Sequence, residues 1–230
     1  MGELINLGGA ATAANERGYL ATPEKGAGPG LVVIQEYWGL VPHIEEVCDR
    51  FAGEGFSALA PDLLRGATAD EPDEADKLMM ALNLQQAAAD MGSAVDYLRS
   101  SPAVRGDGIG VVGFCMGGGL ALMLAAQRPA DIDACVAFYG LIPWESASPD
   151  WTSLDAPVQG HFGEDDDFFS PEKMRDLQAS LDRADKTTDF HLYAGAGHAF
   201  FNDTRPEAYD ESAAALAWTR TLEFLRAKLG

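Results

Sequence analysis

A cysteine stands between two glycines in the segment Gly113-Phe114-Cys115-Met116-Gly117. An apolar run at 109–114 precedes it, and a stretch of helical composition at 116–127 follows it. This order is typical of a nucleophile elbow, a sharp strand-to-helix turn whose glycines avoid collisions with neighbouring backbone. The helix N-terminus favours a thiolate, and the Met116 N–H is placed to stabilise an oxyanion. We therefore predict that Cys115 is a nucleophile, whereas the ordinary alternative is an inert buried thiol.

A nucleophile of this kind needs a general base, and four histidines are candidates. Only His198 follows the last predicted strand in a glycine-rich loop, Gly195-Ala196-Gly197-His198, which can carry an imidazole back over the end of a sheet. His161 and His191 fall within predicted strands, where we expect them to pack. His43 stands at a predicted helix start, where we expect it to cap the helix or face solvent. We predict that His198 is the base.

The acid that orients the histidine is expected after the strand that precedes the histidine's own strand. That position holds four consecutive carboxylates, Glu164, Asp165, Asp166 and Asp167. Their spacing alone does not separate them. A solvated acidic loop is the ordinary alternative, and the spacing of an EF-hand calcium site is absent.

The elements around these residues alternate between strands and helices. Predicted strands cover 31–35, 56–63, 109–114, 134–140, 156–163 and 188–193. Predicted helices cover 42–54, 73–99 as more than one helix, 116–127, 171–182 and 206–229, and residues 3–22 supply short antiparallel strands. Apolar strands alternating with helices indicate an α/β fold with a mostly parallel central sheet and helices on both faces. We expect one domain over 1–230, with its ligand site at the carboxyl ends of the strands.

Composition excludes several function classes. The 36 acidic and 16 basic side chains give a formal charge of −20, which opposes binding to nucleic acid or anionic membranes. We expect no secretory signal, because residues 1–10 contain no basic stretch followed by an apolar one, and the apolar runs are too short to span a bilayer. Three irregularly spaced cysteines indicate free thiols in a reducing compartment, so Cys48 and Cys135 are expected in the core. We predict a cytoplasmic monomer or homodimer that needs no metal or organic cofactor.

Six segments together resemble the dienelactone hydrolase family, which belongs to the α/β-hydrolase superfamily. They are VVIQEYWGL (32–40), PDLLRG (61–66), GFCMGG (113–118), FYG (138–140), GEDDDF (163–168) and GAGHAFFN (195–202). The resemblance covers residues 30–228. Its G-x-x-D-x-F pattern implies Asp166 as the triad acid. It also implies that Glu36 controls the cysteine, whose thiol stays protonated until substrate binds, and that the Tyr37 N–H is the second oxyanion donor.

The family's best-studied members bind a substrate carboxylate with two arginines. This chain has no clean positional match, and Arg65, Lys77 and Arg205 are the cations in the corresponding regions, with surface placement as the default for each. Tyr139 is an aromatic candidate for the pocket wall.

These observations predict hydrolysis of an ester or enol lactone through a thioester on Cys115. Alternatives are a broader carboxylesterase and a hydrolase-fold binding protein without turnover. Another cysteine-elbow enzyme, such as a glutamine amidotransferase, is disfavoured because Phe200 stands where that class has a glutamate.

Overall fold

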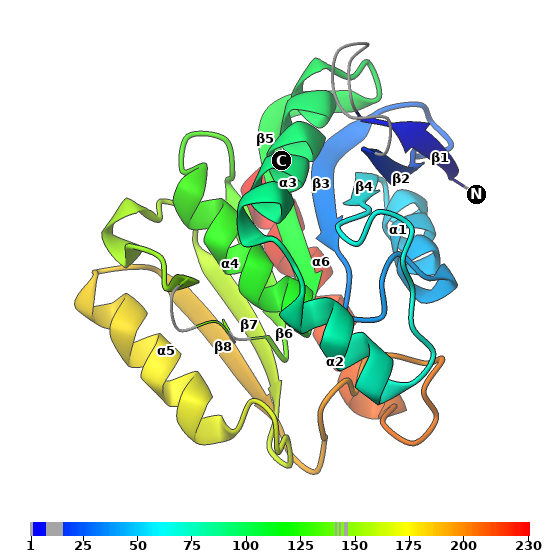
Figure 1. The fold of residues 1–230 in the computed structure, drawn as a ribbon. Coiled ribbons are helices and arrows are strands. Elements are labelled where there is room, and N and C mark those ends of the chain that lie inside the picture. Colours follow the sequence, from blue (N-terminus) through cyan, green and yellow to red (C-terminus); the bar gives the residue numbers. More distant parts are fainter. Residues whose placement is uncertain (1, 8–15, 141, 143, 145–146) are drawn as a thin grey trace. The chain divides into compact units, whose positions relative to one another are not determined.

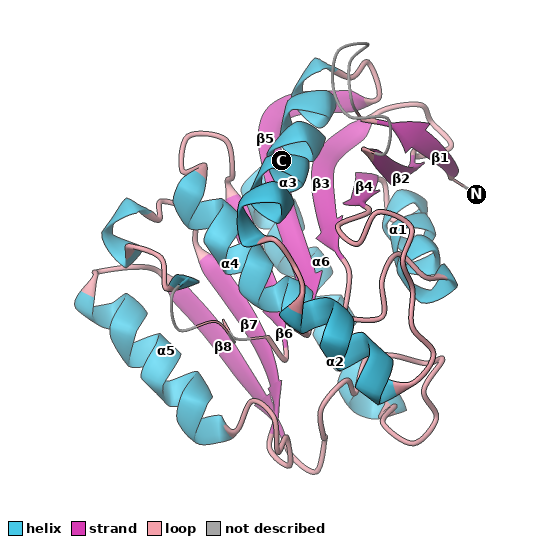
Figure 2. Cartoon of the chain, viewed as in Figure 1, coloured by secondary structure: helices cyan, strands magenta, loops and turns pink. Residues whose placement is uncertain are grey.

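Strands and helices alternate along the chain (Figures 1 and 2). The computed structural model describes residues 2–7, 16–140, 142, 144 and 147–230. The chain divides into two units, residues 1–110 and 111–230, and strand β5 (Val104–Phe114) passes through the boundary. Within the described residues, no helix has the length and apolarity needed to cross a membrane.

The first unit holds a mixed sheet in the strand order β1-β2-β4-β3-β5. Its other strands are β1 (Glu3–Asn6), β2 (Arg17–Ala21), β3 (Gly28–Ile34) and β4 (Ser57–Pro61). Strand β2 pairs antiparallel with β1 and β4, whereas β3 and β4 are parallel. The helices are α1 (Pro42–Gly53), α2 (Pro72–Met80) and α3 (Leu84–Ser100). Both α1 and α3 pack against β3 and β4, which are buried along nearly their whole length.

The second unit continues from β5 in the order β5-β6-β7-β8. Its strands β6 (Ala134–Phe138), β7 (Val158–Gly163) and β8 (Thr188–Tyr193) are parallel neighbours. Its helices are α4 (Met116–Gln127), α5 (Pro171–Arg183) and α6 (Glu211–Leu229), with a short 3-10 helix, η2, at Trp151–Ser153. Helices α4 and α5 cover one face of these strands and α6 covers the other (Figure 1). Parallel strands covered on both faces confirm the predicted α/β fold.

Some element boundaries differ from the predictions, because polar residues at the ends of elements do not follow the pattern of apolar residues. Strand β5 begins at Val104, five residues before the apolar run, because its first residues are exposed. The last helix begins at Glu211 instead of Pro206, since the Asp210 side chain accepts the Ala213 N–H and caps it there. The antiparallel strands expected within 3–22 are present as β1 and β2. The expectation for His43 was wrong, because this side chain is buried within α1.

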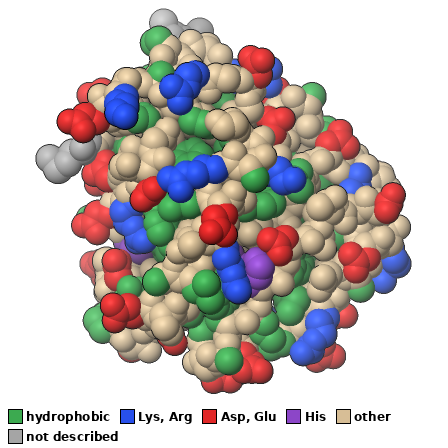
Figure 3. Space-filling view, turned by 180° about the vertical axis from the view of Figure 1, so that it is seen from behind, with side chains coloured by type: hydrophobic (Ala, Val, Ile, Leu, Met, Phe, Trp, Pro, Cys, Tyr) green, Lys and Arg blue, Asp and Glu red, His purple; other side chains and the backbone are tan. Residues whose placement is uncertain are grey.

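Charged side chains are interspersed on one face of the molecule. On the face that Figure 3 shows, acidic and basic side chains lie among one another and do not form separate patches. On this side, the acidic side chains are therefore spread over the face and not gathered in one patch.

Gly113 is a position where the backbone leaves no room for a side chain. A Cβ atom here would lie 1.9 Å from the Gly117 carbonyl oxygen. We expect Gly113→Ala to destabilise the protein by about 3 kcal/mol or more, because backbone cannot move aside cheaply. Gly53→Ala is the matched control, since a Cβ at Gly53 meets nothing within 4 Å. Urea unfolding of both variants checks this, and equal midpoints would contradict it.

Candidate active site

Cys115 occupies a strained turn between β5 and α4. Its backbone angles are φ 53° and ψ −120°, a conformation that side-chain-bearing residues rarely adopt. Two backbone hydrogen bonds hold the turn: the Cys115 N–H donates to Phe138 O at 3.0 Å, and Gly118 N–H donates to Cys115 O at 2.9 Å. A Cβ on Gly140 would lie 2.6 Å from Cys115 O, so glycine is needed there as well. The predicted elbow is thus present, with Met116 as the first residue of α4.

His198 lies in the loop that follows β8, and its ring bridges the thiol and a carboxylate. Its Nε2 lies 3.3 Å from Cys115 Sγ, and its Nδ1 lies 2.8 Å from Asp166 Oδ2. One imidazole therefore has a sulfur partner on one nitrogen and an oxygen partner on the other. This is the arrangement that a nucleophile, a base and an orienting acid require.

Asp166 is set apart from the neighbouring carboxylates by its backbone contacts. Its Oδ1 accepts the N–H groups of Phe168 and Phe169, each at 2.8 Å, and leaves Oδ2 for His198. Asp166 is buried, whereas Glu164, Asp165 and Asp167 are exposed. The structure thus brings one of the four acidic residues to the histidine, and it is the residue that the family resemblance implies.

The surroundings of His198 favour its charged form. Burial lowers the pKa of His198, but hydrogen bonds to Asp166 and Cys115, together with negative charge on both partners, outweigh this effect and raise the pKa to about 10. A protonated imidazole beside the Asp166 carboxylate is therefore a favourable charge arrangement. Such an imidazolium can give its proton to a leaving group.

Three aromatic rings surround the imidazole. The ring centroids of Phe168, Tyr139 and Phe169 lie 5.1, 5.2 and 5.5 Å from that of His198. Tyr139 was a predicted wall residue, and it has a positive φ of 37°. The two phenylalanines were missed as contacts of the histidine. Phe168 is 66% exposed, so its ring is open to a ligand near the histidine.

Glu36 and Tyr37 lie in the first unit, just after β3 ends at Ile34. Glu36 is buried and Tyr37 is half-buried, followed by the buried Trp38. Their control of the thiol and of the oxyanion stays a prediction.

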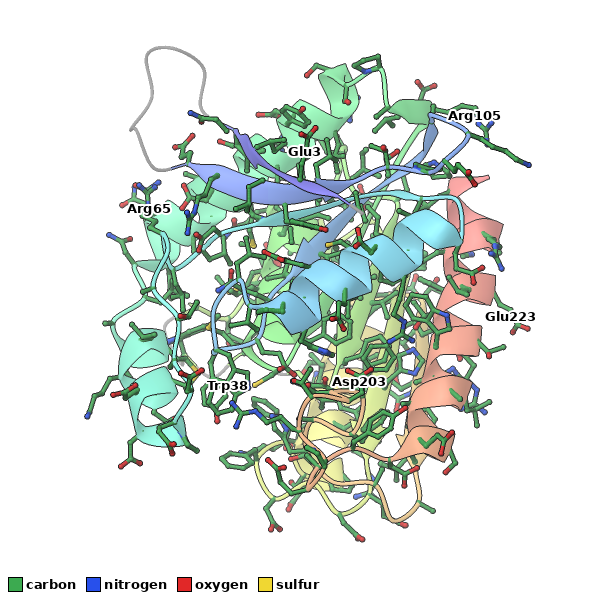
Figure 4. The ribbon with its side chains drawn as sticks, turned by 90° about the vertical axis from the view of Figure 1, so that its right-hand side faces the viewer. Glu3, Trp38, Arg65, Arg105, Asp203 and Glu223 are labelled. Carbon is green, nitrogen blue, oxygen red and sulfur yellow. The ribbon has the colours of Figure 1, made fainter. Side chains whose placement is uncertain are left out.

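The cations proposed for substrate binding have different surroundings. Arg65 forms an ion pair with the buried Asp90 at 2.9 Å, so this arginine has a structural partner within the first unit. Figure 4 labels its side chain. Lys77 is exposed on α2, and Arg205 lies half-buried in a turn beyond the histidine. Their binding of a substrate carboxylate stays a prediction.

Among the described residues, no group of three or more histidine, cysteine, aspartate or glutamate side chains is arranged to hold a metal ion.

Comparison with known proteins identifies the family of this chain. The model of the dienelactone hydrolase family matches residues 17–229. Protein usf of Aquifex pyrophilus is 38% identical over 221 residues, with 91% of this chain and 92% of the relative covered. The carboxymethylenebutenolidase of Pseudomonas putida is 32% identical over 215 residues, with 90% and 89% covered.

Solved structures agree with the sequence comparisons. The crystal structure of a dienelactone hydrolase-like promiscuous phosphotriesterase from metagenomic libraries has a TM-score of 0.86 and 26% identity, with 100% of this chain and 99% of that chain covered. This chain therefore belongs to the dienelactone hydrolase family of the α/β-hydrolase superfamily, and it is a carboxymethylenebutenolidase-like hydrolase.

Proposed function

We propose that the protein cleaves an ester or enol lactone through a thioester on Cys115, with His198 as the acid and base and Asp166 as the orienting acid. The observation that carries this proposal is the line of contacts from Sγ through the imidazole to the carboxylate, 3.3 and 2.8 Å long. Lengths of this order allow proton transfer along the line.

The first half-reaction forms the acyl-enzyme. The Cys115 thiolate attacks the substrate carbonyl carbon, and the electron pair of the C=O bond moves to oxygen. The N–H of Met116, with that of Tyr37, stabilises this oxyanion. When the intermediate collapses, the bond from carbon to the alkoxide oxygen breaks, and the His198 imidazolium gives its proton to that oxygen. For a lactone, the alkoxide stays attached to the acyl group.

The second half-reaction releases the acid. The neutral His198 takes a proton from water, and the hydroxide formed attacks the thioester carbonyl. The C–S bond then breaks and restores the thiolate and the imidazolium. Esters and enol lactones suit this chemistry better than amides, because an amide nitrogen leaves a tetrahedral intermediate less readily than the sulfur does.

The relatives support a proposal for the substrate class. The Pseudomonas putida relative is a carboxymethylenebutenolidase. By similarity, we propose that the substrate of this chain is a lactone that carries a carboxylate group. Arg65, Lys77 and Arg205 are the cations available for such a carboxylate. Glu36, buried after β3, is the group we assign to the control of the thiol. We further propose that residues 1–230 act as one catalytic domain.

A substrate panel tests this function. We expect hydrolysis of a dienelactone and of simple enol lactones, with kcat/KM for the carboxylated lactone at least tenfold above that of an uncharged ester of similar leaving group, because cationic contacts add about 1.4 kcal/mol or more to transition-state binding. Glu36→Gln, assayed in parallel, is expected to lower kcat/KM for the lactone.

The outcomes of the panel are distinct. Equal rates on charged and uncharged substrates would replace the lactonase with a broad carboxylesterase. Absence of turnover on every ester and lactone, with no acyl adduct on the protein, would overturn the function itself and favour a binding protein.

A further inference from the structure

A buried hydrogen-bonded cluster lies in the second unit, where β7, β8 and α6 meet. At its centre is His161, a fully buried residue of β7. Its Nδ1 lies 2.8 Å from the Tyr193 hydroxyl on β8. Its Nε2 lies 3.1 Å from Gln159 Oε1 and 3.0 Å from Thr221 Oγ1 on α6. We call these four residues the His161 cluster.

The partners of Gln159 determine which ring nitrogen carries the proton. Gln159 Nε2 donates to the Asp189 carboxylate at 2.9 Å, so its Oε1 faces His161 and accepts. The His161 Nε2 is therefore the protonated nitrogen, and Nδ1 accepts the Tyr193 O–H. Burial, followed by the positive charges of His191 and Arg220, lowers the pKa of His161 well below its usual range, which keeps the ring neutral.

The outer end of the cluster is held by charged groups at the surface. Arg220 donates to the Tyr193 hydroxyl at 3.3 Å, and its guanidinium lies 5.5 Å from the Tyr193 ring. His191 contacts the Asp189 carboxylate at 3.2 Å. Arg220, His191 and Asp189 line a pocket of about 280 Å³ together with Glu223, which projects from the outer side of α6 (Figure 4). The Tyr193 hydroxyl is thus fixed from both sides.

Tyr193 stands where the two catalytic loops begin. Gly163 and Tyr193 are the last paired residues of β7 and β8, so the loop to Asp166 and the loop to His198 leave the sheet from the same rung. The Glu164 N–H donates to Tyr193 O at 2.9 Å, and the next N–H, of Asp165, donates to Ala196 O at 3.0 Å. The backbone of Tyr193 thus joins the starts of the two loops.

The His161 cluster also contacts the end of β6 and Tyr139, the residue that follows this strand. His161 O accepts the Tyr139 N–H at 2.7 Å, and its ring centroid lies 4.6 Å from that of Phe138. The Tyr139 ring in turn contacts His198. A shift of His161 would thus reach the catalytic histidine by two routes, through Tyr193 and through Tyr139.

We propose that His161 and Tyr193 are positioning residues. They set the distance between the Asp166 carboxylate and the His198 imidazole without touching the substrate. This inference rests on the proposed function, because it assigns a task only if that pair is catalytic. Asp166 and His198 lie on different loops, so both loops must be anchored to the same rigid part of the fold if the two side chains are to stay 2.8 Å apart. A displacement of about 1 Å at such a pair lowers the reaction rate strongly.

The test replaces one hydroxyl. Tyr193→Phe keeps the ring contact with Phe200, centroids 5.1 Å apart, and removes only the hydroxyl, which bonds His161 and accepts from Arg220. We expect kcat per titrated active site to fall about tenfold with KM within about twofold, because substrate contacts are unchanged while the base is misplaced. The pH profile of kcat/KM should shift as well, since the His198–Asp166 bond helps to set the pKa of His198. Tyr97→Phe, at a half-buried tyrosine of α3, is the control.

A purely structural cluster gives a different result. In that case Tyr193→Phe lowers the urea midpoint, yet kcat per active site and the pH profile stay those of the native protein, and the proposal fails. If Tyr193→Phe does not fold, Thr221→Val is read in the same way, because it removes another bond to His161. Failure of the proposed function is separate: the native protein would then show no acyl adduct on Cys115 at all.

Discussion

Cys115→Ala is expected to lower kcat/KM for p-nitrophenyl acetate by about 10⁴-fold or more, because it removes the sulfur on which we propose that the acyl-enzyme forms. Alanine keeps the Cβ atom, so the strained turn at φ 53° is left as it is. Mass spectrometry of the native protein, quenched during turnover, should find the acetyl group on Cys115 and no adduct on the variant.

Cys48→Ala and Cys135→Ala are the matched controls for this result. Both thiols are fully buried, and burial raises the pKa of each, which leaves them protonated and unreactive. We expect both controls to retain activity within about twofold, with a stability loss of roughly 1 kcal/mol from the lost packing. Full activity of Cys115→Ala, or an adduct on another cysteine, would remove Cys115 from the mechanism.

Asp166→Asn is expected to lower kcat by roughly 10³- to 10⁴-fold, the loss typical of a triad whose histidine has the wrong tautomer. The asparagine oxygen can still accept the N–H groups of Phe168 and Phe169, so the loop keeps its shape. Its amide then points N–H groups at His198 Nδ1 and places the ring proton on Nε2, toward the thiol. The variant should also have a lower pKa for His198, since the carboxylate that raises it is gone.

The neighbours of Asp166 supply the controls for this variant. Asp165→Asn and Asp167→Asn change exposed carboxylates by the same single atom type, and we expect kcat within about twofold of the native value. Steady-state kinetics with active-site titration measures all three variants. A comparable loss in either control would move the role of the acid to that residue.

The sequence was most informative where glycines and apolar runs determine the backbone. The elbow at Cys115 was predictable because a nucleophile flanked by two glycines, between a buried strand and a helix, is a pattern typical of this turn. Helix α4 and strand β8 were found at their exact bounds for the same reason, since each is bounded by a clear turn. His198 was predictable because it lies in the glycine-rich loop that follows the last strand.

Long-range polar contacts were beyond the sequence. Spacing did not separate Asp166 from its three neighbours, because the difference lies in a side chain that folds back onto the N–H groups of its own loop. The ion pair of Arg65 joins residues 25 positions apart, and the bonds of His161 join residues 32 and 60 positions apart. Contacts between such distant residues follow no regular spacing in the sequence, so only the folded structure reveals them.

The left-handed backbone at Cys115 places stability and activity in opposition at one position. A residue with a Cβ atom in such a conformation costs about 1–3 kcal/mol, and glycine would remove that cost. Random substitution screened only for heat resistance would therefore be drawn toward glycine at 115 and would lose the sulfur. A thermostable variant of this enzyme must gain its tolerance to heat elsewhere in the chain and leave this turn strained.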